Sequence, residues 1–150
     1  MSERVPREAI DRYRFTAPIT TRWSDNDVYG HVNNVTYLSY FDSIANLYLI
    51  REGGLDLLGD PAIGLVVESR CSFFAPVAYP DELVGALRVD RLGASSVTYA
   101  HALFGPHEPL AAAQATIVHV FVDRATRRPT AIPARIRAAL ERIVVVPLES

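Results

Sequence analysis

The sequence predicts an α+β fold in which one long helix packs against an antiparallel sheet. Residues 35–52 form a continuous helical pattern that is apolar around most of its circumference. Residues 63–123 contain four β-rich segments, which short turns separate. Short turns favour antiparallel neighbours, and an apolar helix needs the apolar face of a sheet to cover it. With 150 residues, the chain is expected to form a single domain over residues 1–150.

The elements follow one another in a simple order. Residues 1–11 are expected to be a loose or helical lead-in, and residues 13–23 a first strand, in which Pro18 indicates an edge or a bulge. Pro133 is expected to open a short helix over residues 134–142. The four strands after the long helix are expected at residues 63–74, 82–92, 96–104 and 109–123, and residues 144–146 form a last strand or a tail. The sheet therefore has five or six strands.

The long helix carries recognisable signals at both ends. Asn33 or Asn34 can cap its start, because an asparagine side chain accepts a hydrogen bond from the free N–H groups of the first turn. Gly53 and Gly54 suit a left-handed C-cap. A thin polar stripe, with Asp42 beside it, argues against a membrane span and for a core helix that is enclosed on nearly every side.

Alternation within residues 63–74 divides the side chains of that strand between two faces. Glu68 falls on the second face, together with the residues two positions before and after it. The first face is expected to hold Leu65, Val67, Ser69, Cys71 and Phe73.

The composition narrows the class of protein. A net charge of −2 gives no reason to expect a nucleic-acid or membrane partner. The single cysteine, Cys71, excludes an internal disulfide, and no zinc-ligand pattern is present in the sequence. The polar start of the chain resembles neither a signal peptide nor a transit peptide, so a cytoplasmic location is expected. A hydrophobic content of 49% makes an oligomer interface plausible.

The segment before and within the long helix carries the most specific motif. It reads Asp-Asn-Asp-Val-Tyr-Gly-His-Val-Asn-Asn over residues 25–34, followed by a helix with Tyr37 and the aromatic-acidic pair Phe41-Asp42. This motif resembles the signature of the hotdog-fold acyl-CoA thioesterases of the 4-hydroxybenzoyl-CoA thioesterase type. Weaker similarities follow in the same order at residues 74–83, 92–97, 118–123 and 132–133.

The resemblance implies a hotdog fold, a long central helix wrapped by a curved antiparallel sheet. It also implies a homodimer whose sheets join edge to edge, with a tetramer of two dimers as the alternative, and active sites at the dimer interface. The implied substrate is a thioester of coenzyme A or of an acyl-carrier protein. In the family the second acidic residue of the motif is the catalytic carboxylate, and that position is Asp27 here.

Thioester hydrolysis is compatible with these residues. A carboxylate can act as general base for water or as nucleophile through a mixed anhydride. Free N–H groups at the start of the helix can polarise the thioester carbonyl, and the helix dipole acts in the same direction. We expect no metal and no cofactor apart from the coenzyme A of the substrate. The expected carbonyl-polarising and substrate-contacting residues are Gly30, His31, Val32, Asn33, Asn34 and Tyr37.

Several of these residues also have a purely structural interpretation. Asp25 is interpreted as a turn former that bonds its own loop. His31 could be a base, although a loop histidine more often fixes local hydrogen bonds. Gly30 is expected to supply a positive φ or a close backbone approach. Asn33 and Asn34 can be caps that also lie beside the substrate, and Tyr37 can touch the acyl group or simply pack.

Other candidates lie within the predicted strands. Glu68 is the second choice for the catalytic acid, and if buried it would need a partner such as Arg70 across an interface. His101 and His119 are interpreted as hydrogen-bonded residues of the sheet. Cys71 is interpreted as a small apolar filler.

Contacts to coenzyme A phosphates are less clearly marked. Some relatives have several basic residues in the hairpin after the third strand, whereas here that turn offers only Arg91, with Ser95 and Ser96. Arg124, Arg127 and Arg128 are the alternative contacts, although a basic turn is usually just solvated.

Two other functions compete with thioester hydrolysis. Dehydratases and hydratases of the same fold use a His-Phe-Pro type motif or an Asp-x-Asn-Pro-x-His motif, and neither occurs here. A non-catalytic binder of acyl groups or acyl-CoA on the same scaffold stays open, because a pocket with a carboxylate does not by itself imply turnover.

Overall fold

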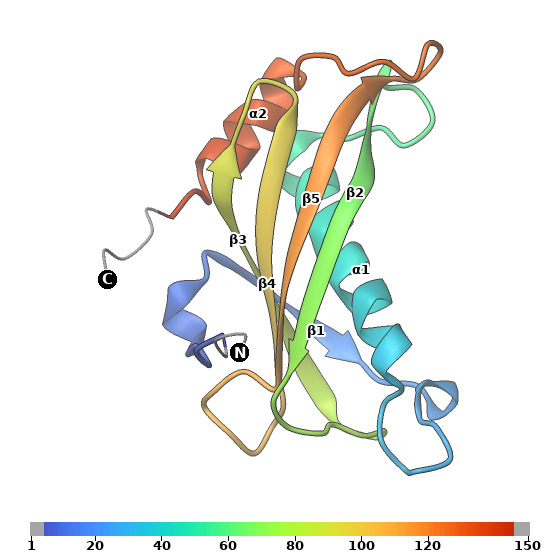
Figure 1. Cartoon of the computed structure of the whole chain (residues 1–150), viewed down its shortest axis with the longest axis vertical. Coiled ribbons are helices and arrows are strands. Elements are labelled where there is room, and N and C mark those ends of the chain that lie inside the picture. The colour runs from blue at the N-terminus through green and yellow to red at the C-terminus, as the bar shows by residue number, and fades with distance from the viewer. Residues whose placement is uncertain (1–4, 146–150) are drawn as a thin grey trace.

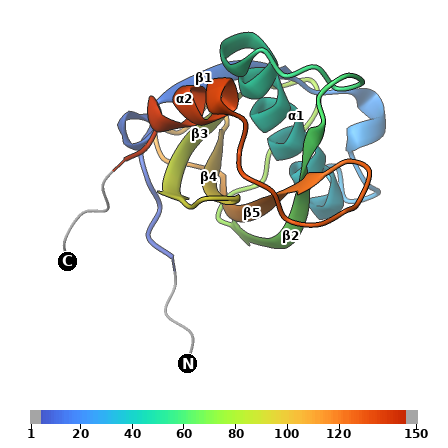
Figure 2. The same cartoon turned by 90° about the horizontal axis from the view of Figure 1, so that it is seen from above.

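The computed structural model describes residues 5–145, which form one curved sheet around a central helix (Figures 1 and 2). The neighbouring strands are antiparallel, in the order β1-β3-β4-β5-β2. This is the hotdog arrangement that the resemblance implies. In chain order the strands and α-helices are β1 (Phe15–Thr20), α1 (Asn34–Gly53), β2 (Ala62–Phe73), β3 (Glu82–Leu92), β4 (Ser96–Phe104), β5 (Ala113–Asp123) and α2 (Ala134–Glu141).

Helix α1 begins and ends as its capping residues predict. The Asn33 side chain accepts a hydrogen bond from the Val35 amide at 3.2 Å, which identifies Asn33 as the N-cap. At the other end Gly54 is the C-cap, with a left-handed φ of 65°. Both ends of α1 are therefore fixed by short-range sequence signals.

The sheet curves closely around one side of α1. Gly85 on β3 lies where the helix approaches most tightly, because a Cβ atom built there would be 2.6 Å from Cγ1 of Ile44. The helix is less enclosed than expected, however. Val35, Leu38 and Ile50 are exposed, and so are polar residues such as Asp42. One chain thus leaves one side of α1 uncovered.

The order of the strands differs from the one that short connections suggest. Strands β2 and β3 are joined by residues 74–81 but do not pair, because β2 pairs with β5 at the far edge of the sheet. Three strand spacings amount to roughly 14 Å, which eight residues can readily cross. The connection passes beneath the ends of β4 and β5 (Figure 1). The expectation that every short connection joins paired strands was therefore wrong for this pair.

The face assignment within β2 also needs correction. The register against β5 shifts between Val66 and Glu68, so Val67 is an extra residue that reverses the alternation. Ser69, Cys71 and Phe73 consequently share a face with Val66, and not with Leu65 as the unbroken alternation predicts.

The remaining strands are found where the sequence predicts them, and they differ from the prediction mainly in the residues at which they begin and end. Strands β3 and β4 have the predicted bounds, whereas β1 is shorter than residues 13–23 and β5 begins at Ala113 instead of residue 109. Pro18 lies in the edge strand β1, as expected. Val144 forms an isolated parallel bridge with Val89, and residue 146 of the expected last strand or tail lies outside the described residues.

Candidate functional site

The loop before α1 is folded back on itself like a tight hairpin. The Asn33 amide donates to the Asp25 carbonyl at 2.8 Å, and the Asp27 amide donates to the His31 carbonyl at 2.9 Å. Gly30 lies at the tip with a φ of 83°, a conformation that favours glycine, and its amide donates to the Asp27 carbonyl. The positive φ expected for Gly30 is confirmed.

The connection between β2 and β3 holds this loop from the side. The Val32 amide donates to the Val77 carbonyl at 2.8 Å, and the Asn26 side chain accepts from the Tyr79 amide at 3.0 Å. The ring of Tyr79 also packs edge-on against Trp23. The unexpected crossing of the sheet by residues 74–81 thus provides a support for the loop.

Asp25 anchors the loop from within the protein, and only 1% of its surface is exposed. Its carboxylate accepts hydrogen bonds from the Tyr40 hydroxyl at 2.5 Å and from the Arg22 amide at 2.9 Å, and it forms an ion pair with the Arg22 side chain. Burial opposes ionisation of Asp25, but the hydrogen bonds from Tyr40 and Arg22 outweigh it and lower the pKa of the carboxyl. The structural interpretation of Asp25 fits this environment, although the residue bonds α1 as well as its own loop.

Asp27 has a different environment although it is only two residues away. Its side chain is half-buried, and Oδ1 accepts a hydrogen bond from the Tyr29 amide at 2.9 Å. Within residues 5–145, Oδ2 has no hydrogen-bond partner. One carboxylate oxygen is therefore held in place while the other can interact with a ligand.

Several amide groups of the same loop are also available. The Val32 and Asn33 amides are used inside the protein, and the Val35 amide is used by the N-cap. Among the described residues, the amides of Val28, His31 and Asn34 donate to no protein acceptor. The Asn34 amide belongs to the first residue of α1, where the helix dipole favours negative charge.

The side chains of the loop contribute less than its backbone. His31 is exposed, and its ring makes no hydrogen bond to any described residue, so the expected local hydrogen bonds of His31 are not found. Asn34 is also exposed, and Asn33 is half-buried in its capping position. Val32 is buried in the core, so of the expected loop residues it is the least available to a substrate.

Tyr37 joins the first turn of α1 to the edge of the sheet. It is buried, and its ring packs edge-on against Phe73 of β2 with the centroids 5.0 Å apart. Phe73 itself is 50% exposed. This aromatic pair lies at the end of β2 that is close to the loop, where it can border an acyl group.

The alternative acid Glu68 lies on the exposed edge strand and not in a buried position. Its side chain is 61% exposed and forms an ion pair of 3.7 Å with Arg70 of the same strand. Glu68 was expected to need a partner such as Arg70 across an interface only if it were buried, and within one chain it is not buried. Glu68 follows the β2 bulge directly, which turns its side chain away from α1.

The histidines of the central strands are buried without hydrogen bonds, which contradicts their interpretation as hydrogen-bonded residues. His101 is 1% exposed, and neither ring nitrogen has a partner; the same holds for Nδ1 of His119 and the hydroxyl of Tyr99. Burial lowers the pKa of His101 to about 3. These side chains face α1, where the His101 ring packs against Phe41, so their neighbours are mainly apolar.

The candidate phosphate contacts belong to the β3–β4 hairpin and the turn after β5, which lie at the opposite end of the sheet from the loop before α1 (Figure 1). Arg91, Ser95 and Ser96 belong to the β3–β4 hairpin and its flanks, and Arg127 and Arg128 to the exposed turn after β5. Arg124 is already engaged, because its guanidinium donates to the carbonyls of Asp60 and Leu57 at 2.9 and 2.8 Å. One chain therefore does not bring these residues to the Asp27 loop.

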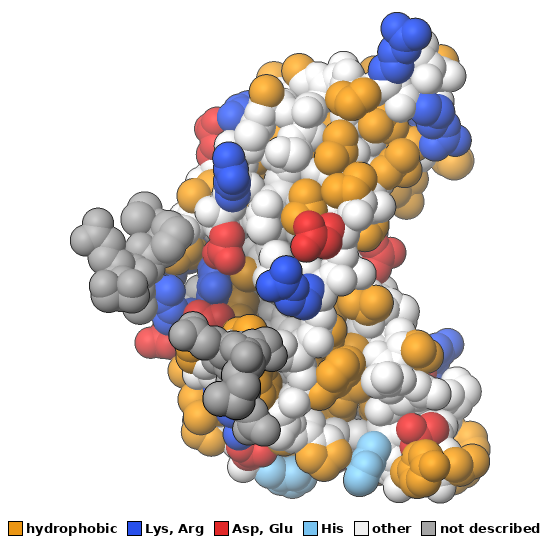
Figure 3. Space-filling model, viewed as in Figure 1, with side chains coloured by type: hydrophobic (Ala, Val, Ile, Leu, Met, Phe, Trp, Pro, Cys, Tyr) orange, Lys and Arg blue, Asp and Glu red, His pale blue; other side chains and the backbone are white. Residues whose placement is uncertain are grey.

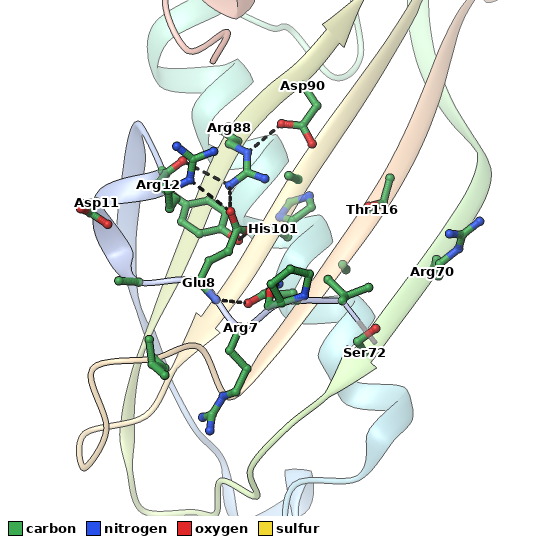
Figure 4. A pocket seen from close by; sticks show the side chains of 18 residues that line it. Arg7, Glu8, Asp11, Arg12, Arg70, Ser72, Arg88, Asp90, His101 and Thr116 are labelled. Atoms are coloured by element: carbon green, nitrogen blue, oxygen red, sulfur yellow. Dashed lines mark hydrogen bonds and ion pairs between the residues drawn. The ribbon is translucent and has the colours of Figure 1, made fainter. Parts of the chain in front are cut away.

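A separate cavity lies on the face of the sheet away from α1, between the strands and the N-terminal segment (Figures 3 and 4). It has a volume of about 690 Å³. Its wall contains a network in which Arg88 pairs with Glu8 and Asp90 at 3.0 and 2.7 Å. None of the expected site residues lines it, so this cavity is separate from the Asp27 loop.

Two further features concern membranes and metals. No helix among the described residues is long and apolar enough to cross a membrane. Residues 5–145 contain no group of three or more histidine, cysteine, aspartate or glutamate side chains that could hold a metal ion.

The half-buried Cys71 packs against the core, as its interpretation as a filler predicts, and burial raises the pKa of its thiol to about 11.

Tyr40 is the site residue that sequence reasoning missed. The apolar pattern of residues 35–52 treats Tyr40 as one more core residue of the helix, although its hydroxyl holds Asp25. A buried tyrosine hydroxyl usually finds a partner, and Tyr40 lies within two helical turns of the acidic loop, which is the signal that could have identified it.

Known proteins resemble the chain in both sequence and structure. The YsmA protein of Bacillus subtilis (strain 168) is 26% identical over 88 residues, which is 57% of this chain and 58% of that protein. The PA5185 protein from Pseudomonas aeruginosa strain PAO1 is 52% identical in its crystal structure, with a TM-score of 0.90 over 93% of this chain and 97% of that chain. A thioesterase from Thermus thermophilus, in complex with coenzyme A and Zn, is 26% identical, with a TM-score of 0.73 over 85% of this chain and 98% of that chain.

The family assignment rests on a match that covers most of the chain. The model of the thioesterase-like superfamily matches residues 21–140, which include the Asp27 loop, α1 and the whole of strands β2 to β5. The chain therefore belongs to the thioesterase-like superfamily and has the hotdog fold.

Proposed function

We propose that the protein hydrolyses an acyl-CoA thioester, or the thioester of an acyl-carrier protein, with Asp27 as the catalytic carboxylate. The observation that carries this proposal is the local arrangement of the loop. A half-buried carboxylate with one free oxygen, Oδ2 of Asp27, lies in the same tight loop as the free amides of Val28, His31 and Asn34. A nucleophile or base next to hydrogen-bond donors is what acyl transfer requires.

The reaction would proceed by one of two routes that use the same residues. As a general base, Asp27 would take a proton from water while the oxygen of that water attacks the thioester carbon. As a nucleophile, its Oδ2 would attack that carbon, release the thiolate and form a mixed anhydride, which water then hydrolyses to the free acid. In both routes the carbonyl oxygen gains negative charge, and one well-placed donor is typically worth about 10²–10³ in turnover.

The choice of coenzyme A is supported by the Thermus thermophilus relative, which was crystallised with coenzyme A. Binding of coenzyme A would require contacts to its phosphates. The exposed cations available for these contacts are Arg91, Arg127 and Arg128. The hairpin and the turn that carry them lie at the opposite end of the sheet from the loop before α1 in one chain (Figure 1). A site that includes both groups would therefore need a second chain.

Strand β2 is suited to recruit that second chain. It is a twelve-residue edge strand, and Leu65, Val66, Val67 and Phe73 are exposed along it. Long apolar edge strands tend to pair with another chain. If two β2 strands pair antiparallel about a two-fold axis, the partner's basic end approaches the Asp27 end of the first chain. We therefore propose a homodimer with shared sites, with a tetramer of two such dimers as the alternative.

A hydrolysis screen tests this proposal directly. The purified chain is incubated with a panel of acyl-CoA thioesters, and the released thiol is followed over time. We expect thiol release by the wild-type chain and its loss in Asp27→Asn. Tight binding of acyl-CoA without thiol release would support the binder instead, and conversion of the acyl chain with the thioester intact would support a hydratase or dehydratase.

A further inference from the structure

Tyr40 connects the rigid part of the protein to the loop that carries Asp27. It lies on the second turn of α1, is 8% exposed, and donates its hydroxyl to Oδ2 of Asp25 at 2.5 Å. Through its own carbonyl, Asp25 accepts the Asn33 amide at 2.8 Å. The two bonds tie both strands of the hairpin-like loop, and thus the segment between them, to the helix.

The other partner of Asp25 cannot provide this connection. Arg22 donates its amide and its guanidinium to the Asp25 carboxylate, but it precedes the loop by only a few residues, and its side chain is 74% exposed. Arg22 therefore holds the Asp25 carboxylate within their own short turn and does not connect it to α1. Among the described residues, the Tyr40 hydroxyl is the only side-chain group of α1 that hydrogen-bonds the Asp25 carboxylate.

We propose that Tyr40 and Asp25 form a positioning pair that fixes Asp27 and the free amides of its loop relative to the start of α1. The inference rests on the proposed function, since its catalytic consequence requires Asp27 to act on the substrate. Neither residue needs to touch the substrate. Tyr40 holds Asp25, and Asp25 holds the loop in the register in which Oδ2 of Asp27 and the amides of Val28, His31 and Asn34 are free.

The burial of Asp25 makes its hydrogen bond from Tyr40 energetically important. A buried carboxylate depends on its hydrogen-bond donors, so the loss of the Tyr40 hydroxyl leaves an under-satisfied charge inside the protein. The loop can relieve this by moving Asp25 toward water, which also moves Asn33 and the residues between them. Displacements of about 1 Å at a reacting group can reduce turnover by about 10²-fold.

Helix α1 offers a matched control for this pair. Tyr48 is also buried on α1, and its hydroxyl donates to the Ala139 carbonyl of α2. Tyr48 lies eight residues further along the helix, away from the loop. Tyr40→Phe and Tyr48→Phe each remove one buried hydroxyl and keep the ring, so they differ mainly in whether the lost bond holds the Asp25 loop.

Steady-state kinetics of the two variants test the inference. We expect Tyr40→Phe to lower kcat by about tenfold or more, with a KM close to that of the wild type, because the positioning of the reacting groups is lost and not the binding of the substrate. Tyr48→Phe should lower the melting temperature and leave kcat close to wild type. Equal kcat values for the two variants would overturn the positioning role.

Amide hydrogen exchange provides a readout that does not depend on activity. In Tyr40→Phe the Asn33 amide should exchange at least about tenfold faster than in the wild type, whereas Tyr48→Phe should leave it unchanged. If the Asn33 amide exchanges in Tyr40→Phe as slowly as in the wild type, the proposal that Tyr40 and Asp25 position the loop is refuted, whatever the activity of the variant is. Accelerated exchange in a protein that hydrolyses no thioester would instead refute the proposed function and keep the anchoring of the loop.

Discussion

Asp25 and Asp27 are separated by a single residue, yet the structure gives their carboxylates opposite environments. Asp25 is 1% exposed, and its carboxylate accepts hydrogen bonds from the Tyr40 hydroxyl and the Arg22 amide. Asp27 is half-buried and keeps Oδ2 free of any partner among residues 5–145. Asp25 ends the short 3-10 turn Trp23–Asp25, where its carboxylate accepts the Arg22 amide and the Tyr40 hydroxyl, whereas the Asp27 carboxylate accepts only the Tyr29 amide of its own turn. The pair therefore combines an anchor with a reactive group.

The first prediction compares the two aspartates directly. Asp27→Asn is nearly isosteric and can still accept the Tyr29 amide, so the fold and the ligand affinity should persist. It cannot accept a proton or form an anhydride, so turnover should fall by at least about 10²-fold. Asp25→Asn should lower turnover much less and the melting temperature more. Both variants are measured by steady-state hydrolysis and thermal melting, and equal losses of turnover would indicate that the two residues act as one structural unit.

The second prediction concerns the loop tip, for which the chain provides a matched glycine. Gly30 and Gly54 both have a positive φ, of 83° and 65°, and an added Cβ atom would meet no severe contact at either position. An alanine at such a φ costs roughly 1 kcal/mol. Gly30→Ala and Gly54→Ala should therefore lower the melting temperature to a similar extent, but only Gly30→Ala should reduce kcat.

This comparison separates a folding role from a catalytic role. Gly54 caps α1 at the end far from Asp27, so backbone strain at Gly54 should not change the orientation of the loop amides. If Gly30→Ala keeps full activity and only melts earlier, Gly30 serves folding alone, and the loop amides do not need their present orientation.

The third prediction is a dependence of stability on pH that originates in His101. Burial lowers the pKa of His101 to about 3, whereas an unfolded histidine has a pKa near 6.5. Below pH 6.5 the unfolded chain binds a proton that the folded chain refuses, so stability falls with pH in the window between about 6.5 and 3. The slope from one such group approaches about 1.4 kcal/mol per pH unit.

Replacement of the ring isolates this contribution. His101→Phe keeps an aromatic side chain against Phe41 and removes the titrating group, so its stability should decline less between pH 6 and 4 than that of the wild type. Chemical denaturation at each pH gives the free energy of unfolding. Parallel curves for the two proteins would mean that His101 does not titrate differently in the folded and unfolded chains.

The sequence predicted the individual elements well because their signals are local. Helix α1 has a strong N-cap at Asn33 and a glycine C-cap, and β3 and β4 have the bounds that the sequence predicts. The site loop was identified through its motif, and the expected role of Gly30 followed from its residue type. At these positions the local signals agree with the tertiary fold.

Features that depend on contacts between distant segments of the chain could not be predicted from such local signals. The bulge at Val67 and the pairing of β2 with β5 are set by how strands meet, which a period of two does not encode. The hydroxyl contact between Tyr40 and Asp25 joins two elements, and a pattern of apolar residues records only that Tyr40 is buried. The absence of hydrogen bonds at His101 likewise depends on what α1 places opposite it.

The fourth prediction concerns the proposed dimer edge. Val67 is 59% exposed on β2, and a lysine on an edge strand opposes pairing with another chain. Val67→Lys should shift the protein from a dimer toward the 16.6 kDa monomer in light scattering and should reduce activity with it. The control is Leu58→Lys, which adds the same charge at an exposed position before β2. A wild-type chain that is a monodisperse monomer would contradict the proposed dimer.

The last prediction addresses how coenzyme A would be held. Arg91 and Arg128 are exposed, and among residues 5–145 no side-chain hydrogen bond engages either guanidinium, so both are free to meet phosphates. Arg124 instead supports the connection before β2 through the carbonyls of Asp60 and Leu57. A charge-assisted hydrogen bond is worth roughly 1.5–3 kcal/mol, so loss of a phosphate contact should raise KM by about tenfold or more.

Two substrates distinguish a phosphate contact from a general defect. Arg91→Ala and Arg128→Ala should raise KM for an acyl-CoA and leave unchanged the kcat/KM for the same acyl group on pantetheine, which lacks the nucleotide. Arg124→Ala should lower the melting temperature and affect both substrates alike. If all three variants raise KM only for acyl-CoA, Arg124 must exchange its backbone partners for phosphate when substrate binds. If none does, the basic turn is only solvated, and the nucleotide is held elsewhere or the substrate is carried by a protein.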